Sequence, residues 1–435
     1  MGAAFLHPQF KNEPYWHEAA PRRDGPFADV PRSVDVLIVG SGYTGMSAAR
    51  TLAKAGRQVV VLDAGRPGDG ASSRNAGFVG TSLLASFSRL RKIAGVEKAV
   101  EAYTEAKRAY AFVTELIRQE SIDCTFEQNG RIYWAYTTSQ LDGLKSEFAE
   151  MQRHLGKKGE IIGPDHASGE SGSRLYCGGL LLPETGALHP GKWHDGLMGL
   201  AEAAGATVIG KVAVKKIAPA GKGHSVSTTR GTVNAREVIV ATDGYIGNET
   251  PALRRRILPV NVQVVATEPL APGVVQRIMP THRVHADVRA MPQYWRLSPD
   301  KTRLLLCARS GLPNGDMVAQ VRANHRSIVE LFPQLEGARI THYWTGRTGF
   351  TSNRMPHLGT RDGIHFALGF NGAGVAMGAY IGHCIASRVI GGGGCGSVFS
   401  EGKFATVPFG ASGSRFVPLL STLATIRRWL EIQAG

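Results

Sequence analysis

The sequence predicts a mixed α/β (α+β) fold, in which a parallel βαβ unit joins a second domain built on a mostly antiparallel sheet plus helices. Two apolar, β-branched runs, residues 34–40 and 57–65, flank a helical stretch and have the pattern of buried parallel strands. Residues 261–267 and 293–309 instead show the apolar alternation that is typical of a half-exposed antiparallel sheet. The length of 435 residues allows about two to three domains.

Composition narrows the class of protein. Hydrophobic residues make up 43% of the chain and charged residues 20%, which excludes a disordered or fibrous protein. Glycine is the outlier at 54 of the 435 residues, because its usual share is about 7%. The formal net charge of +15 permits an acidic substrate, nucleic acid or an anionic membrane surface as partner. Since the basic pairs are scattered and not interleaved with aromatic residues, we expect no nucleic-acid partner.

The cysteine content, the N-terminus and one uncharged stretch indicate the cellular compartment and whether the chain spans a membrane. The five cysteines are odd in number and form no C-x-x-C pair, which argues against a disulfide framework or a zinc site and suggests a reducing compartment. They are Cys124, Cys177, Cys307, Cys384 and Cys395. The first 23 residues lack the basic start and apolar core of a signal peptide. The uncharged stretch 367–387 contains several glycines, so we interpret it as a strand running into a buried helix. We therefore expect a cytoplasmic protein with no membrane span and no metal site.

The remaining elements follow in chain order. Residues 1–33 are rich in proline, charge and aromatics, and we expect an extended arm that docks on the body. Apolar steps of three and four residues predict helices over 96–119 and 138–155. Pro190 begins a further helix that ends before Gly205. Other predicted segments are strands at residues 130–136, 212–217, 237–242 and 364–368, a glycine-rich helix after residue 373, and an amphipathic helix over 414–432.

A glycine motif carries the first functional prediction. Residues 40–45 read G-x-G-x-x-G and lie directly after a buried strand at the start of a helix. Gly40 permits the tight turn, Gly42 lets the backbone approach a pyrophosphate, and Gly45 lets the helix pack close to the strand. Asp63 closes the second strand, where a carboxylate accepts hydrogen bonds from ribose hydroxyls and disfavours a 2′-phosphate. This Rossmann-like βαβ unit predicts a dinucleotide site.

The continuation of the chain favours FAD over NAD, because residues 68–80 are small, polar and glycine-rich. The segments VGSGYTGMSAARTLAKAG, VLDAG, GASSRNAG, VIVATDGY, TSNRMPHLG and GFNGAGVAMG occur in that order. With them the chain resembles the FAD-dependent amine and amino-acid oxidase family, the D-amino-acid-oxidase-like (DAO) group, over roughly residues 13–430. The TSNRMPHLG and SSRNAG variants look most like γ-glutamylputrescine oxidase and its relatives.

The resemblance implies a division of the chain and a set of cofactor contacts. The division is an arm (1–33), a discontinuous FAD-binding domain (34–90, 180–250 and 340–395), a substrate-binding domain (91–179 and 251–339) and a C-terminal segment (396–435). The implied FAD contacts are Gly40, Gly42, Tyr43, Thr44, Gly45, Asp63, Ala64, Ser72, Ser73, Arg74, Asn75, Ala76, Gly77, Val212, Ala241, Thr242, Gly244, Gly369, Phe370, Asn371, Gly372, Ala373, Gly374 and Val375. Some relatives attach flavin through a cysteine near Gly346 or a histidine near residues 72–75. Neither residue is present, so non-covalent FAD is expected.

The resemblance also places the helix that follows Gly369–Val375 with its N-terminus at the flavin pyrimidine, where the positive helix end stabilises a reduced flavin. It implies oxidation of a C–N bond of a small primary or secondary amine or amino acid by hydride transfer to flavin N5, followed by imine hydrolysis. Tyr294, Arg309, Arg347 and Asn371 are the expected catalytic contacts, and Tyr294, Arg296, Arg309 and Arg347 the expected substrate contacts. Arginines at these positions would clamp a carboxylate or other anion.

The electron acceptor stays open at this stage. Sarcosine-oxidase-like relatives carry a lysine over the flavin that promotes reaction with oxygen, and the aligned residue in this chain is Leu305. A dehydrogenase that uses another acceptor is therefore an alternative to an oxidase. A tRNA-modifying flavoenzyme is a second and weaker alternative, suggested by the positive charge.

Overall fold

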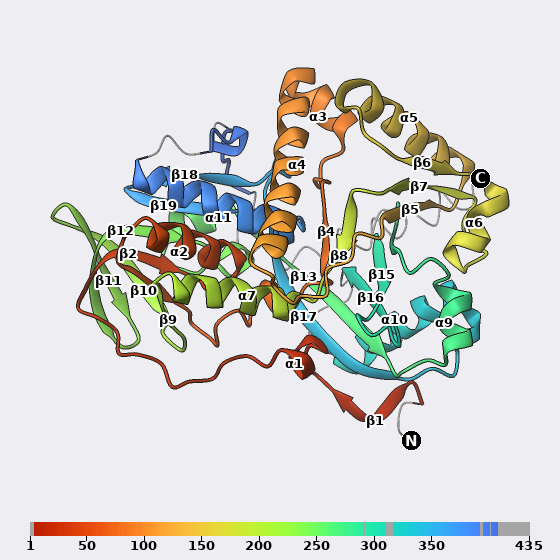
Figure 1. Cartoon of the computed structure of the whole chain (residues 1–435), viewed down its shortest axis with the longest axis horizontal. Coiled ribbons are helices and arrows are strands. Elements are labelled where there is room, and N and C mark those ends of the chain that lie inside the picture. The colour runs from red at the N-terminus through yellow and green to blue at the C-terminus, as the bar shows by residue number, and fades with distance from the viewer. Residues whose placement is uncertain (1–3, 290–291, 310–315, 392–394, 401, 408–435) are drawn as a thin grey trace.

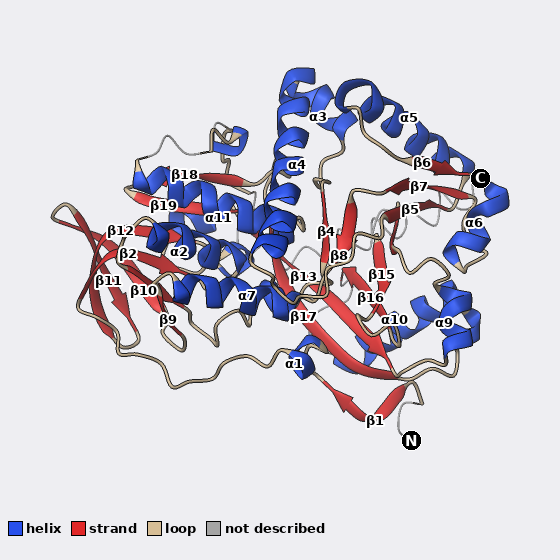
Figure 2. Cartoon of the chain, in the orientation of Figure 1, coloured by secondary structure: helices blue, strands red, loops and turns tan. Residues whose placement is uncertain are grey.

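The computed structural model describes residues 4–289, 292–309, 316–391, 395–400 and 402–407. Two large sheets lie at either end of the long axis, with helices packed between and around them (Figures 1 and 2). The smaller units are the two-stranded ribbon β4 (Phe78–Gly80) and β8 (Thr185–Ala187), and the 3₁₀ turns η1 (Ala71–Ser73), η2 (Asp243–Tyr245), η3 (Pro333–Leu335) and η4 (Val398–Ser400).

The first sheet contains the predicted βαβ unit. Its main path runs β10 (Val214–Ala220), β11 (Gly223–Thr228), β12 (Gly231–Val240), β2 (Ser33–Val39), β3 (Val59–Leu62) and β9 (Thr207–Ile209), and β19 (Ile364–Leu368) and β18 (His357–Arg361) join through β12. The strands β19, β12, β2, β3 and β9 are parallel, with Leu37 of β2 opposite Val60 and Val238. The centres of both apolar runs, Val36–Val39 and Val59–Leu62, are buried, because helices cover one face and apolar side chains of β11 and β12 pack with the other.

Helix α2 (Tyr43–Lys54) packs on β2 and β3 and also contacts both α7 (Pro190–Ala203) and α11 (Gly374–Ile390), and α11 packs on β19. They share one hydrophobic core with α4 (Val96–Gln119), to which Met46, Leu52 and Ile381 contribute fully buried side chains. The uncharged stretch that suggested a membrane span is thus β19 followed by the buried helix α11, as predicted. Among the described residues, no helix is both long and apolar enough to cross a bilayer.

The second sheet has nine strands in the order β1 (Leu6–Lys11), β17 (Ile340–Phe350), β13 (Leu258–Thr267), β16 (Leu304–Arg309), β15 (Gln293–Leu297), β14 (Val284–Asp287), β5 (Arg131–Ala135), β7 (Gly178–Leu182) and β6 (Glu160–Ile162). All neighbours are antiparallel except β1–β17 and β14–β5, which confirms the mostly antiparallel second domain. The other helices of the described residues are α3 (Phe87–Ala94), α5 (Thr138–Leu155), α6 (Pro164–Ser171), α9 (Pro272–Ile278) and α10 (Met317–Leu331), with the short helices α1 (Trp16–Ala19) and α8 (Pro251–Arg254).

The helices predicted over 96–119 and 138–155 have those bounds in the structure. Two expectations need correction. The division at residue 340 assigned β17 to the dinucleotide domain, but β17 pairs with β1 and β13, so it belongs to the nine-stranded sheet. The cysteine pattern argued against disulfides, yet Cys384 and Cys395 are joined across a Cα–Cα distance of 5.1 Å. The helix predicted over 414–432 lies outside the described residues.

Candidate active site

The glycine turn and helix α2 form the floor of the site. Gly42 precedes α2, and a Cβ atom on Gly42 would lie 2.9 Å from Ser72 Oγ. A Cβ atom on Gly45 would lie 1.9 Å from the Gly40 carbonyl oxygen, so only glycine allows the helix to approach the end of β2 this closely. The first N–H groups of α2 have no partner within the helix, and that of Tyr43 donates to Ser72 Oγ at 3.0 Å on the cavity wall. The local geometry therefore suits an anion such as a pyrophosphate at the start of α2.

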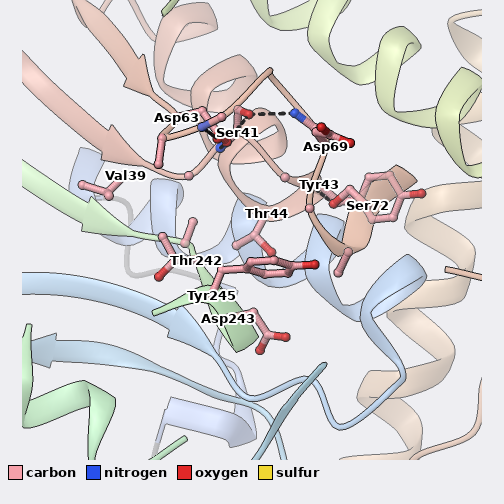
Figure 3. Close-up of a pocket in the computed structure, with 18 of the residues that line it drawn as sticks. Val39, Ser41, Tyr43, Thr44, Asp63, Asp69, Ser72, Thr242, Asp243 and Tyr245 are labelled. Atoms are coloured by element: carbon pink, nitrogen blue, oxygen red, sulfur yellow. Dashed lines mark hydrogen bonds between the residues drawn. The ribbon is translucent and has the colours of Figure 1, made fainter. Parts of the chain in front are cut away.

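Asp63 links the turns that follow β2 and β3. One carboxylate oxygen accepts hydrogen bonds from the Ser41 backbone N–H at 2.9 Å and from Ser41 Oγ, and the other accepts from Gly65 N–H at 2.9 Å. The Ser41 hydroxyl in turn accepts from Gly68 N–H at 2.9 Å. The acid predicted at the end of the second strand therefore holds both turns at the carboxyl edge of the sheet, as the dashed lines of Figure 3 show.

These turns surround a cavity of about 410 Å³, within the range of small-molecule sites. Of the expected FAD contacts, the cavity wall includes Gly40, Gly42, Tyr43, Thr44, Asp63, Ala64, Ser72, Asn75, Val212, Ala241, Thr242, Phe370, Gly372, Gly374 and Val375. Figure 3 shows several of them around one space. They come from the carboxyl ends of β2, β3, β9 and β12, from η1 and the residues after it, and from the starts of α2 and α11. The structure thus gathers at one place residues that are hundreds of positions apart in the chain.

The other expected FAD contacts do not line this cavity: Gly45, Ser73, Arg74, Ala76, Gly77, Gly244, Gly369, Asn371 and Ala373. Some of them shape its walls. Arg74 pairs with the Asp69 carboxylate at 2.8 Å and donates to the carbonyl oxygens of Asp69 and Thr345. Its side chain therefore ties the loop 68–75 to itself and to strand β17.

Three acids of the cavity wall, Asp243, Asp69 and Glu249, were not predicted from the sequence, and Asp243 has the most backbone partners. Its carboxylate accepts hydrogen bonds from the backbone N–H groups of Gly349 at 2.9 Å and Gly369 at 2.8 Å, with a longer one of 3.3 Å from Phe370. Burial raises the pKa of Asp243, although these N–H donors oppose the rise. The residue joins the end of β12, strand β17 and the loop before α11. Its position in VIVATDGY, directly after a buried strand, was the available signal.

Other wall residues that the sequence did not single out are Val39, Ser41, Leu62, Gly65, Arg66, Gly68, Asp69, Gly70, Ala71, Val214, Tyr245, Glu249 and Thr348. An unsatisfied group supports a ligand at this wall. Thr242 Oγ1 is buried and has no hydrogen-bond partner among the described residues. A buried hydroxyl without a partner costs free energy of about 1–3 kcal/mol, so a polar ligand group beside it is favoured. The donor-rich turn, the orphaned hydroxyl and the acidic strand end all fit the polar parts of a dinucleotide.

Two of the expected site residues, the substrate contact Arg296 and the catalytic contact Asn371, bond to other groups of the protein. Arg296 is buried, and its guanidinium donates to the carbonyl oxygens of Leu297, Ala76 and Leu188, at 2.9, 3.3 and 2.8 Å. Burial lowers the pKa of this arginine to about 10. Asn371 is buried too, and its amide bonds to the Thr351 N–H at 3.0 Å and to the Gly369 carbonyl. In this structure Nε and Nη1 of Arg296 and the amide of Asn371 secure loops.

The other expected contacts are placed differently. Tyr294 lies on β15, where its ring centroid is 6.1 Å from that of Phe78 in the segment after the 68–77 loop. Arg347 is exposed near the end of β17, with its guanidinium carbon 5.7 Å from the Tyr245 ring centroid. The backbone of Arg309 ends β16 opposite Val262, and its side chain lies outside the described part of the chain.

A second cavity, of about 540 Å³, adjoins the first. Its wall consists of Asp69, Arg74, Tyr245, Asn261, Met317, Gln320, Thr345, Gly346 and Arg347. Asp69 and Tyr245 belong to both walls, so the two cavities meet at these side chains. The second cavity therefore brings the cationic end of β17 next to the dinucleotide-like site.

The comparisons with known proteins agree with this geometry. Residues 35–388 match the family model described as DAO, FAD dependent oxidoreductase. The chain belongs to this family. It is 30% identical to γ-glutamylputrescine oxidoreductase of Escherichia coli (strain K12) over 94% of this chain and 98% of that protein. The family assignment makes this chain an FAD-dependent oxidoreductase.

Solved structures share the fold at lower identity. Glycine oxidase from Geobacillus kaustophilus superposes with a TM-score of 0.69 and 22% identity, covering 87% of this chain and 98% of that one. L-proline dehydrogenase from P. horikoshii superposes with a TM-score of 0.70 and 18% identity, covering 85% of this chain and 96% of that one. These similarities confirm the mixed α/β architecture predicted from the sequence.

Proposed function

We propose that this FAD-dependent oxidoreductase oxidises a C–N bond of a small primary or secondary amine or amino acid. The observation that carries the proposal is the pair of adjoining cavities, one built for a dinucleotide and the other bordered by Arg74 and Arg347. The similarity to γ-glutamylputrescine oxidoreductase, an enzyme named for an amine substrate, supports the same class of donor. When bound, FAD supplies the acceptor for the hydride equivalent of the substrate C–H bond, and water completes the reaction by hydrolysing the imine.

The chain's own residues bind and orient in this proposal. The turn at Gly40–Gly45 and the start of α2 would hold the pyrophosphate, and Asp63, on the same cavity wall, would accept a hydrogen bond from the ribose. The N-terminus of α11 borders the same cavity through Gly374 and Val375, and its positive end favours negative charge there. Position 346 is a glycine and not a cysteine, and residues 72–75 contain no histidine. These two positions therefore offer no side chain for covalent attachment, which supports non-covalent binding of the cofactor.

We further propose that the substrate carries an anionic group. Arg347 is exposed on the wall of the second cavity and stacks on Tyr245, which leaves its planar donors available to a carboxylate. Arg74, on the same wall, is already paired with Asp69, so it contributes less net charge. Tyr294, on β15 beside Phe78, is the proposed side-chain contact on the sheet side.

Either oxygen or another electron acceptor can reoxidise the reduced cofactor. One residue, Leu305, favours an acceptor other than oxygen. Leu305 is fully buried in an apolar cluster with Trp16, Val264 and Trp344. Because this position of β16 holds a leucine, it lacks the positive charge that would favour electron transfer to oxygen there. A dehydrogenase with a non-oxygen acceptor is therefore the alternative to an oxidase.

An anaerobic bleaching screen tests the proposed function. The FAD-loaded protein is mixed, without oxygen, with polyamines, γ-glutamyl amines, N-methyl amino acids and simple amino acids, and loss of the visible flavin absorption is followed. Bleaching by at least one amine is expected, with imine hydrolysis products in solution. Admission of air then separates the two candidates, because an oxidase regains its absorption quickly and a dehydrogenase slowly. A protein that holds FAD and is bleached by dithionite but by no amine would contradict the proposal.

A further inference from the structure

The N-terminal arm, residues 4–32, lies outside the matched family segment, which begins at residue 35. In Figure 1 it runs from β1 and α1 along one edge of the molecule to β2, and so passes both sheets. Strand β1 extends the nine-stranded sheet by pairing in parallel with β17. The arm contains Trp16, which is fully buried, and Arg22, whose side chain is 1% exposed. A dispensable extension would not bury a tryptophan and an arginine this completely, because ordering them costs conformational entropy.

Trp16 touches the loop that lines the cofactor cavity. Its indole Nε1–H donates to the Asn75 carbonyl oxygen at 2.9 Å. Trp344 of β17 donates in the same way to the neighbouring Arg74 carbonyl at 2.8 Å. The Trp16 ring packs edge-on against Trp344 and His189, with centroid distances of 6.2 and 5.0 Å. Two consecutive carbonyls of the loop are therefore held by indole groups: that of Asn75 by Trp16 of the arm, and that of Arg74 by Trp344 of β17.

His17 contacts the same loop. Its Nε2 lies 3.2 Å from Ser73 Oγ, and the Ser73 hydroxyl already donates to the Gly68 carbonyl at 2.8 Å. Nε2 is therefore the donor in the His17–Ser73 bond. Burial lowers the pKa of His17 to about 4, against the opposing pull of Asp69, so the ring is neutral at pH 7.

Arg22 reaches the glycine turn through one intermediary. Its guanidinium pairs with Asp195 at 2.8 Å and approaches His194 Nδ1 at 3.1 Å. His194 Nε2 lies 2.7 Å from the Ser41 carbonyl oxygen, which can only accept. Nε2 of His194 therefore donates to Ser41, while its Nδ1 faces the Arg22 guanidinium and lies 3.4 Å from Asp195 Oδ1. The arm in this way fixes the orientation of a ring that holds a residue of the cavity wall.

We propose that residues 15–22 of the arm are a positioning segment for FAD, which holds the 40–45 turn and the 68–75 loop in their cofactor-binding geometry. The proposal rests on the cofactor placement given under the proposed function. None of the described arm residues lines the cavity, so the segment acts through Asn75, Ser73 and His194. Preorganisation of this kind raises affinity because fewer groups are ordered when the ligand binds.

Conservative variants separate this role from a general structural one. Trp16→Phe keeps an aromatic ring but removes the donor to Asn75. Arg22→Lys keeps a positive charge beside Asp195 but removes the planar guanidinium, which contacts Asp195 and His194 at the same time. The matched control is Arg23→Lys, since Arg23 pairs with Glu202 at 2.8 Å and bonds to the Val208 carbonyl, and touches neither loop. We expect the dissociation constant of FAD, titrated into full-length apoprotein, to rise at least tenfold in the first two variants and less than twofold in the control.

Wild-type hydrogen–deuterium exchange supplies a second measurement that needs no variant. FAD should slow amide exchange in residues 15–22 together with the 68–75 loop, although the arm does not touch the cavity. Wild-type affinity in folded Trp16→Phe and Arg22→Lys proteins, or equal exchange of the arm with and without FAD, would overturn the proposal. Failure of wild-type protein to bind FAD would instead overturn the cofactor placement itself.

Discussion

At the scale of single residues, Gly42 sets how closely a ligand approaches the backbone. Gly42→Val would place a branched side chain within 2.9 Å of Ser72 Oγ and into the cavity wall. We expect FAD affinity to fall at least tenfold, which equals about 1.4 kcal/mol or more, measured by equilibrium titration of apoprotein. Gly143→Val is the control, because Gly143 lies in α5 with no atom within 4 Å of its Cβ position. Unchanged affinity in Gly42→Val would remove the turn from the cofactor site.

Asp243 provides the second prediction at this scale. An asparagine in its place would turn an NH₂ group toward at least one backbone N–H, because one carboxylate oxygen serves Gly369 and the other serves Gly349. We expect Asp243→Asn to lower the free energy of unfolding by about 1–3 kcal/mol, measured by urea denaturation with and without FAD. Asp142→Asn, at an exposed pair with Lys145, should change it by less than about 1 kcal/mol. Equal stability of the two variants would show that the bonds of Asp243 contribute nothing.

At the scale of elements, the contact between α11 and α2 holds two parts of the cofactor site together. A Cβ atom on Gly382 would lie 2.3 Å from the Thr44 carbonyl oxygen, so Gly382→Ala must push α11 away from the start of α2. We expect a loss of about 1–3 kcal/mol in stability together with weaker FAD binding. Gly199→Ala in α7 is the control, because its added Cβ meets nothing within 4 Å and alanine favours a helix. Thermal denaturation in which Gly382→Ala unfolds no earlier than Gly199→Ala would contradict this packing.

The helices and strands differ in how well the sequence predicts them, because some are encoded locally and others depend on tertiary contacts. Local signals sufficed for β2, α2, β3, α4 and α5, because apolar periodicity, a glycine motif and helix ends are encoded within a few neighbouring residues. Long-range partners were not encoded in that way. Arg296 resembled a substrate clamp, but the carbonyls of Ala76 and Leu188 come from distant segments. The pairing of β17 with β13 and the Cys384–Cys395 disulfide likewise depend on tertiary contacts that no local pattern reports.

At the scale of the whole molecule, buried histidines set the response to acid. Burial is the largest cause of a lowered pKa at seven described histidines. The pKa is about 4 at His17, His189, His342 and His357 and about 3 at His285, and it is also lowered at His365 and His383. Their pKa in the unfolded chain is near 6.5, so between about pH 6.5 and 4 the unfolded state binds more protons than the folded state. Folding stability is therefore complete above about pH 6.5 and falls as the pH is lowered through this window.

Thermal melting across pH measures this response. The melting temperature should hold between pH 7 and 8 and decline progressively from about pH 6.5 downward. Replacing buried His285, which stacks between Trp134 and Trp295, with glutamine should reduce the steepness of the decline, even though the variant starts less stable. A melting temperature that stays constant down to pH 4.5 would contradict the account of buried neutral histidines.

Every functional prediction above requires that the cavity between the glycine turn and α11 holds FAD without a covalent bond. The most direct measurement is the visible absorption of the purified wild-type protein before and after acid precipitation, with Gly42→Val beside it. We expect wild-type protein to show a flavin spectrum, the flavin to pass completely into the acid supernatant as FAD, and Gly42→Val to be nearly colourless. A folded wild-type protein that is colourless and takes up no FAD, or flavin that stays with the precipitate, would contradict the claim.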